Sequence, residues 1–141
     1  MSPHNLLPLL AFVLNVSLAA LSLLRNPGSR LNRVFAYFAS SMALWNFGVF
    51  LLRASPDEWT AYLTEILIHV GVIALPAFYY HFILIFLDST TRHRPSLVLA
   101  YTGAFIYELI NLSGSSLFMT GVKSTSWGWA PATGPLYLPS F

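Results

Sequence analysis

Four long apolar runs, separated by short polar segments, make up most of the chain. They cover residues 5–24, 34–52, 59–87 and 97–119. An apolar stretch of about 18 or more residues can cross a bilayer as a helix, because a helix makes its backbone hydrogen bonds internally. The pattern therefore predicts an all-α fold, a polytopic membrane helix bundle with four transmembrane helices.

The polar segments contain the signals expected at helix ends. Residues 25–33 are rich in Arg, Asn, Gly and Pro, and either Ser55 or Asp57 is a candidate N-cap of the third helix. As a helix the third run would be roughly 40 Å long, against a hydrocarbon core of about 30 Å. We expect a tilt, a kink at Pro76 or an amphipathic outer end to accommodate the difference.

The segment after the fourth run, residues 120–141, has a different composition. It contains three prolines, three glycines and four aromatic residues, Trp127, Trp129, Tyr137 and Phe141. Amphipathic aromatic rings gather at membrane interfaces. We therefore predict an outer loop at the interface, within a single membrane domain that covers residues 1–141.

The composition supports the membrane assignment and excludes several classes of protein. Hydrophobic residues make up 56% of the sequence and charged residues 9%, whereas a soluble domain has about a quarter charged residues. The absence of cysteine excludes disulfides and cysteine metal sites. The pI near 9.2 does not indicate nucleic-acid binding, because the arginines lie beside apolar runs rather than on one basic face.

The positive charges predict the orientation in the membrane. Residues 1–4 contain no Lys or Arg, which favours an uncleaved first helix over a signal peptide. One side of the membrane would hold only Arg53 and Lys123, and the other side would hold Arg25, Arg30, Arg33, Arg92 and Arg94. Because cytoplasmic loops carry the excess of Lys and Arg, we expect these five arginines in the cytoplasm and the N-terminus and tail outside.

Ionisable residues within a membrane helix are costly and therefore mark candidate functional positions. Glu108 falls near the middle of the fourth run, and the spacing places Tyr101, Glu108, Asn111 and Ser115 on one helical face. That face should look into the bundle. Two interpretations stay open: a ligand, proton or signal-relay site, or a protonated Glu108 that holds helices together by hydrogen bonding.

The third run contains a second candidate pair. Glu65 and His69 are four residues apart, so they share a helical face and can pair directly. His81 lies about 120° around the helix from His69, so the two histidines should not form one site. A lone histidine in such a helix is more often a donor between helices than a ligand for a metal or substrate.

No motif in the sequence indicates a catalytic centre, a cofactor or a metal ion. The single lysine, Lys123, lies in the tail, whereas a retinal Schiff base needs an intramembrane lysine. Glu65 and His69 lack the order and the second histidine of a zinc-protease helix. Phosphate-binding glycine loops and nucleophile elbows are also absent from the sequence, and four histidines are too few for a membrane di-iron enzyme.

Several short segments occur in the order expected for a known family. They are residues 25–36 (RNPGSRLNRVFA), 43–48 (ALWNFG), 55–57 (SPD), 69–72 (HVGV) and 75–82 (LPAFYYHF), then Trp127-Gly128-Trp129, Pro131 and Gly134-Pro135-Leu136-Tyr137. Together they resemble the N-terminal seven-transmembrane sensor region of bacterial histidine kinases. The resemblance covers nearly the whole chain and about the first four helices of that region.

The resemblance implies an input module in the bacterial cytoplasmic membrane that passes a stimulus to a cytoplasmic kinase. It implies a homodimer, an unidentified small ligand and, through domains outside this chain, a response regulator. Helices five to seven, the phosphoacceptor histidine and the ATP-binding domain have no counterpart in residues 1–141. The chain would therefore be either a fragment of a longer gene product or a truncated stand-alone protein, and an open outer loop that ends in Leu-Pro-Ser-Phe favours the fragment. His69 and His81 should not be mistaken for the phosphorylated histidine.

The sequence thus predicts a membrane sensor module whose sensing surface is formed by Glu65, His69, Glu108 and Asn111. One alternative is a small transporter or channel subunit with Glu108 as the proton or cation carrier. Another is a non-catalytic membrane assembly protein, in which these polar residues serve stability alone.

Overall fold

The computed structural model describes residues 3–126 and 128–136. Its elements are α1 (Pro3–Arg25), α2 (Arg30–Ala54), α3 (Glu58–Phe86), α4 (Arg94–Leu112), β1 (Met119–Thr125) and β2 (Gly128–Thr133). All four helices are long and apolar enough to cross a membrane, as the sequence predicts. Trp127, Tyr137 and Phe141 of the predicted interface loop lie outside the described residues.

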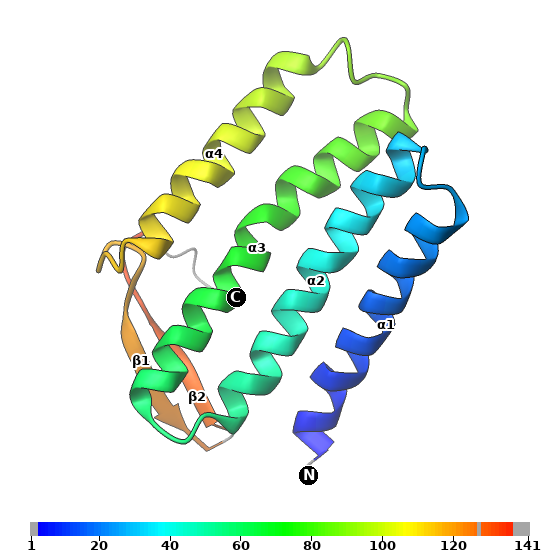
Figure 1. Ribbon diagram of the computed structural model, residues 1–141. Helices are drawn as coiled ribbons and strands as arrows, with labels where there is room; N and C mark the ends of the chain where they lie inside the picture. Colours follow the sequence, from blue (N-terminus) through cyan, green and yellow to red (C-terminus); the bar gives the residue numbers. More distant parts are fainter. Residues whose placement is uncertain (1–2, 127, 137–141) are drawn as a thin grey trace.

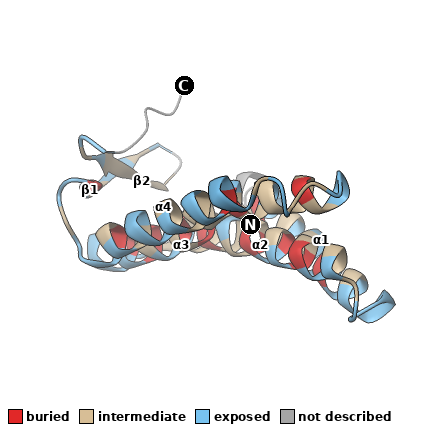
Figure 2. Ribbon diagram, turned by 90° about the horizontal axis from the view of Figure 1, so that it is seen from above, coloured by how far each residue is buried: buried red, intermediate tan, exposed pale blue. Residues whose placement is uncertain are grey.

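The helices lie side by side in chain order, so that α2 packs between α1 and α3, and α3 between α2 and α4 (Figure 1). In the described part of the chain, extensive helix contacts join only consecutive helices. Seen from above, they form a row, and the hairpin of β1 and β2 stands to one side of it (Figure 2). Most buried positions belong to α2 and α3, whereas α1 and α4 are largely exposed.

The two ends of the helices differ in their chemistry (Figure 1). At the arginine-rich end lie the α1–α2 and α3–α4 connections, with Arg25, Arg30, Arg33, Arg92 and Arg94. At the hairpin end lie the α2–α3 connection, the end of α4 and the two strands. The predicted separation of five arginines from Arg53 and Lys123 is therefore present in the fold.

Small residues allow α2 and α3 to approach closely. A Cβ atom on Gly71 of α3 would stand 2.8 Å from the backbone oxygen of Ser41 on α2, and one on Gly48 would overlap the side chain of Ile68. Ala43 of α2 and Ala61 of α3 are also buried, whereas Ala36 and Ala39 of α2 are buried together with Ala19 of α1. Association of helices in lipid depends on such close packing, because the surrounding acyl chains are as apolar as leucine.

Local hydrogen bonds define both ends of α3. Asp57 is the N-cap, since its carboxylate accepts a 2.9 Å bond from the Thr60 backbone N–H, and the Thr60 hydroxyl donates a second bond. These bonds lower the pKa of Asp57. The helix passes through Pro76 without interruption and ends at Phe86, with Leu87 as its C-cap. Asp88 follows with a φ of 48°, the left-handed conformation that is common just after a helix.

Helix α4 is shorter than predicted and begins earlier. It starts at Arg94 because Pro95 is compatible with a first helical turn, and it ends at Leu112, where Gly114 follows with a φ of 66°. The apolar residues Phe118 and Met119 extend the hydropathic run but are buried beside α3 rather than lipid-spanning. The predicted end at residue 119 was therefore wrong.

The predicted loop at 120–141 contains a β-hairpin. Strands β1 and β2 pair antiparallel, with Thr125 opposite Gly128 and an irregularity between Met119 and Gly121. Pro131 lies in β2, which is compatible with pairing because both strands of a two-stranded sheet are edge strands. The fold is therefore four membrane-spanning helices with a small two-stranded addition at one end.

Candidate functional site

The hairpin end of α3 contains a buried carboxyl and a buried imidazole. Glu65 and His69 are 3% and 5% exposed, so both side chains are almost fully removed from the surroundings. His69 Nδ1 lies 2.7 Å from the Glu65 backbone oxygen and 3.7 Å from the carboxyl Oε1. Because a carbonyl oxygen can only accept, Nδ1 carries the proton of the shorter bond. The pairing predicted from the four-residue spacing is present, with the backbone carbonyl as the closer partner.

Asn111 of α4 connects this part of α3 to the neighbouring helix. Its side-chain N–H donates a 3.1 Å bond to the backbone oxygen of Ile66, the residue that follows Glu65, and a 3.3 Å bond to Glu108 Oε1. Asn111 is only 3% exposed. The side-chain amide of Asn111 therefore links α4 to α3 and also binds the carboxyl group of Glu108.

Two buried oxygen atoms in this region have no hydrogen-bond partner among the described residues: Glu65 Oε2 and Asn111 Oδ1. A buried polar atom without a partner costs free energy, so few occur in folded proteins and each needs a reason. Both atoms can accept hydrogen bonds, and a protonated carboxyl could also donate one. Both atoms therefore retain an unused capacity to accept a hydrogen bond.

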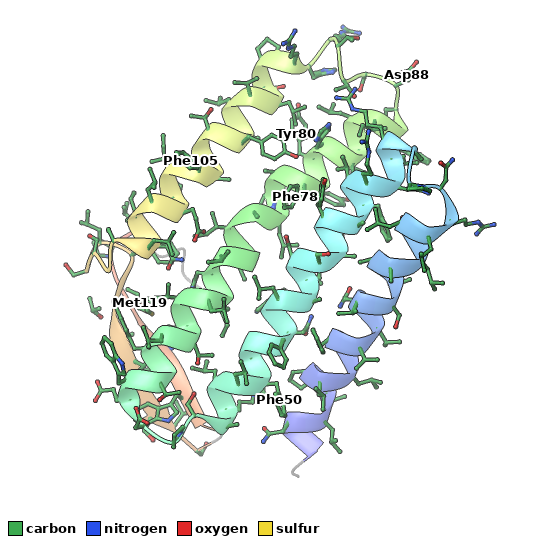
Figure 3. All side chains as sticks on the ribbon, in the orientation of Figure 1. Phe50, Phe78, Tyr80, Asp88, Phe105 and Met119 are labelled. Carbon is green, nitrogen blue, oxygen red and sulfur yellow. The ribbon has the colours of Figure 1, made fainter. Side chains whose placement is uncertain are left out.

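The chain after α4 covers the buried imidazole. The ring of Phe118 meets that of His69 edge to face at 4.9 Å, and Met119, labelled in Figure 3, is buried at the start of β1. The hairpin then packs across the α2–α3 connection, where Trp129 Nε1–H donates a 3.1 Å bond to the Ser55 backbone oxygen. Gly128, with a φ of 123°, fits against Arg53 where a Cβ would stand 3.2 Å from its Cα.

A second polar contact between α3 and α4 lies towards the arginine-rich end. His81 Nδ1 and the Tyr101 hydroxyl are 2.9 Å apart, and Tyr80, which points towards α4 in Figure 3, is 2.8 Å from the Ser96 hydroxyl. His81 thus has partners different from those of His69. The prediction that the two histidines belong to separate sites is confirmed.

The structure brings together the four predicted sensing residues Glu65, His69, Glu108 and Asn111 through these bonds, although Glu108 is not at the middle of its helix. It lies one turn before the end of α4 at Leu112, because the helix stops earlier than its hydropathy suggests. Ser115 lies beyond the helix and does not share its face. The argument from mid-membrane burial therefore does not apply to Glu108.

Sequence reasoning missed the roles of Phe118 and the Ile66 carbonyl. The segment from Ser113 to Ser116 is the signal that could have ended the fourth helix early, since it is small, polar and contains Gly114. That ending would have separated Phe118 from the transmembrane run. The backbone oxygen of Ile66 carries no sequence signal, because every residue has one.

Residues 7–139 match the family described as the N-terminal 7TM region of histidine kinase. The chain belongs to this family. Searches of curated proteins and of solved structures find no match to it.

Two properties follow from membership of this family. It is a multi-pass membrane protein region, which agrees with its four apolar helices. The family is a sensor region of histidine kinases and is not itself their catalytic part.

Proposed function

We propose that the chain is the membrane-embedded input module of a signal-transducing histidine kinase, and that it relays a ligand or membrane stimulus to a cytoplasmic output domain outside residues 1–141. The arginine-rich end would face the cytoplasm of a bacterial inner membrane, and the N-terminus and hairpin would lie outside. The complete kinase would act as a homodimer and pass its phosphoryl group to a response regulator.

One observation carries the location of the sensing surface. At the point where α4 meets α3, the buried atoms Glu65 Oε2 and Asn111 Oδ1 have no partner among the described residues. A small molecule with N–H or O–H donors would satisfy them and stabilise whichever arrangement of α4 holds both acceptors close together. A ligand shifts an equilibrium only by its differential affinity for two arrangements, and these acceptors provide that difference.

Helix α4 is the element best suited to move. Among the described residues it contacts only α3 extensively, and three hydrogen-bonded pairs join the two helices, Asn111–Ile66, His81–Tyr101 and Tyr80–Ser96. By contrast, α2 and α3 are held by close backbone packing. A stimulus at the hairpin end would thus reach the arginine-rich end through a shift of α4 along α3.

The first test is to read the DNA after the codon for Phe141. An open frame that continues into three apolar runs and a kinase core would support the proposal, whereas a stop codon at that position would contradict it. The transporter and assembly alternatives would then need testing by proton flux and by stability, respectively.

The second test measures autophosphorylation of the complete gene product in membrane vesicles with radiolabelled ATP. Asn111→Leu should change the steady level of phosphorylation at least severalfold, because it removes the bond to Ile66. Leu109→Ala is the matched control on α4. Because Leu109 is 52% exposed, this substitution should leave the level of phosphorylation unchanged. Equal phosphorylation of wild type and Asn111→Leu would argue that these polar residues serve stability alone.

A further inference from the structure

A cavity of about 500 Å³ lies at the arginine-rich end, away from the proposed sensing surface. It is bounded by the start of α2, the α3–α4 connection and the first two turns of α4, which lie near one another at the upper end in Figure 1. Its lining residues are Arg30, Thr90, Thr91, Arg94, Leu97, Val98, Tyr101 and Thr102.

Half of the lining residues of this cavity give it the chemistry of an anion site. Two guanidinium groups, from Arg30 and Arg94, line it together with the hydroxyls of Thr90 and Thr91, and its described lining includes no Asp or Glu. Arginine binds phosphate through paired N–H donors, and a threonine hydroxyl can add a further bond. The first turn of α4 adds the positive end of the helix dipole, and no side chain caps the N-terminus of this helix.

Other residues of the lining are apolar. Leu97 and Val98 follow Arg94 along α4, and Tyr101 lies roughly 10 Å from Arg94 along the helix axis. Val98 is 58% exposed, so this side of α4 opens towards the surrounding lipid. A free phosphate ion would use only the arginines and threonines, whereas a phospholipid would use both the polar and the apolar residues of the lining.

We propose that this cavity binds an anionic phospholipid, with its phosphate between Arg30 and Arg94 and the start of an acyl chain along Leu97 and Val98. Basic pockets between membrane helices are suited to anionic head groups. One lining residue also contacts α3, because the Tyr101 hydroxyl is hydrogen-bonded to His81. A bound lipid would thus fix the start of α4 relative to α2 and α3.

The test uses the purified 141-residue chain in a neutral detergent, titrated with phosphatidylglycerol or phosphatidylcholine while its thermal unfolding is followed. A ligand that binds the folded state raises the unfolding midpoint. Phosphatidylglycerol should raise it, and the double variant Arg30→Gln/Arg94→Gln should need about tenfold more of this lipid for the same rise. Inorganic phosphate and glycerol 3-phosphate at equal concentration should leave the midpoint unchanged.

The matched control is Arg25→Gln/Arg92→Gln, which removes the same charge from the same end but from outside the cavity. It should respond to phosphatidylglycerol as the wild type does. A second variant, Thr102→Trp, fills the cavity and keeps every charge, so it tests the site even where the double arginine variant fails to fold. It too should require about tenfold more lipid.

Three results would overturn the proposal. An equal loss of the response to phosphatidylglycerol in Arg25→Gln/Arg92→Gln would mean that positive charge at this end attracts the lipid without a specific site. An equal response to phosphatidylcholine would remove the need for an anionic head group. An equal response to inorganic phosphate would make the ligand a free anion rather than a lipid.

Discussion

Helix α3 contacts a neighbour on each side, and the two contacts are built differently. Against α2 it packs closely at two glycines, because a Cβ on Gly71 would approach the Ser41 backbone of α2 and one on Gly48 of α2 would overlap Ile68. Against α4 it makes hydrogen bonds at a few points, through Asn111, Tyr101 and Ser96. Packing against a backbone leaves little freedom, whereas isolated hydrogen bonds can be exchanged for others, so α2 and α3 form the rigid pair and α4 the adjustable helix.

The largest expected effect comes from breaking the rigid pair. Gly71→Leu should destabilise the domain by about 3 kcal/mol, because the new side chain would overlap the Ser41 backbone and force α2 and α3 apart. Chemical unfolding in detergent measures the loss. Gly103→Leu is the control, since a Cβ on Gly103 meets nothing within 4 Å. Equal losses for both variants would refute the distinction between the two contacts.

A smaller effect should follow from loosening α4. Asn111→Leu removes the bond to the Ile66 oxygen and should cost about 1 kcal/mol, as is usual for hydrogen bonds between membrane helices. Amide hydrogen exchange should become faster in α4 and stay unchanged in α2. Faster exchange throughout all four helices would show that Asn111 stabilises the whole domain and not the α3–α4 contact.

The hairpin follows α4 in the chain but packs on α2 and α3, so it should behave as part of the rigid pair. Trp129→Phe removes the donor to the Ser55 oxygen and should cost somewhat less than 1 kcal/mol. Lys123 in β1 is the single lysine of the sequence, so cleavage by a lysine-specific protease reports opening of the hairpin. Cleavage should accelerate a few-fold, whereas Trp59→Phe, at a residue 67% exposed, should leave it unchanged.

The smallest effect concerns the start of α3 and depends on pH. The Thr60 bonds lower the pKa of Asp57, so the ionised carboxylate stabilises the fold at neutral pH, and this contribution is lost as pH falls through the lowered pKa. Asp57→Ala should therefore be less stable than wild type at pH 7, and the difference should shrink in acid. Asp57→Asn keeps a capping oxygen without titrating, so its stability relative to Asp57→Ala should depend little on pH.

Hydropathy was sufficient to predict the four helices, since only long apolar runs can span a bilayer. It failed at the end of α4, because Phe118 and Met119 are apolar for packing against protein and not against lipid. Hydropathy does not distinguish these two environments. The hairpin was missed for a related reason: its glycines and Pro131 resemble those of a loop, although a two-stranded sheet tolerates them.

The candidate site was partly predictable. Glu65 and His69 could be paired from spacing alone, because positions four apart share a helical face. The bond from Asn111 to the Ile66 oxygen could not, since it depends on how far α4 is displaced along α3. The close approach at Gly71 was equally hidden, because a glycine in an apolar run does not reveal which backbone it faces.

The close approach at Gly71 also has a mechanical consequence. Helix α3 is about 43 Å long, and Gly71 lies roughly 20 Å from one end and 22 Å from the other. Gly48 touches α3 one turn away, at Ile68. The closest backbone contact of α3 with α2 therefore lies near the middle of the helix, with nearly equal lengths on either side. Any change in the tilt of α3 about this contact would move Glu58 and Phe86 by similar distances in opposite directions.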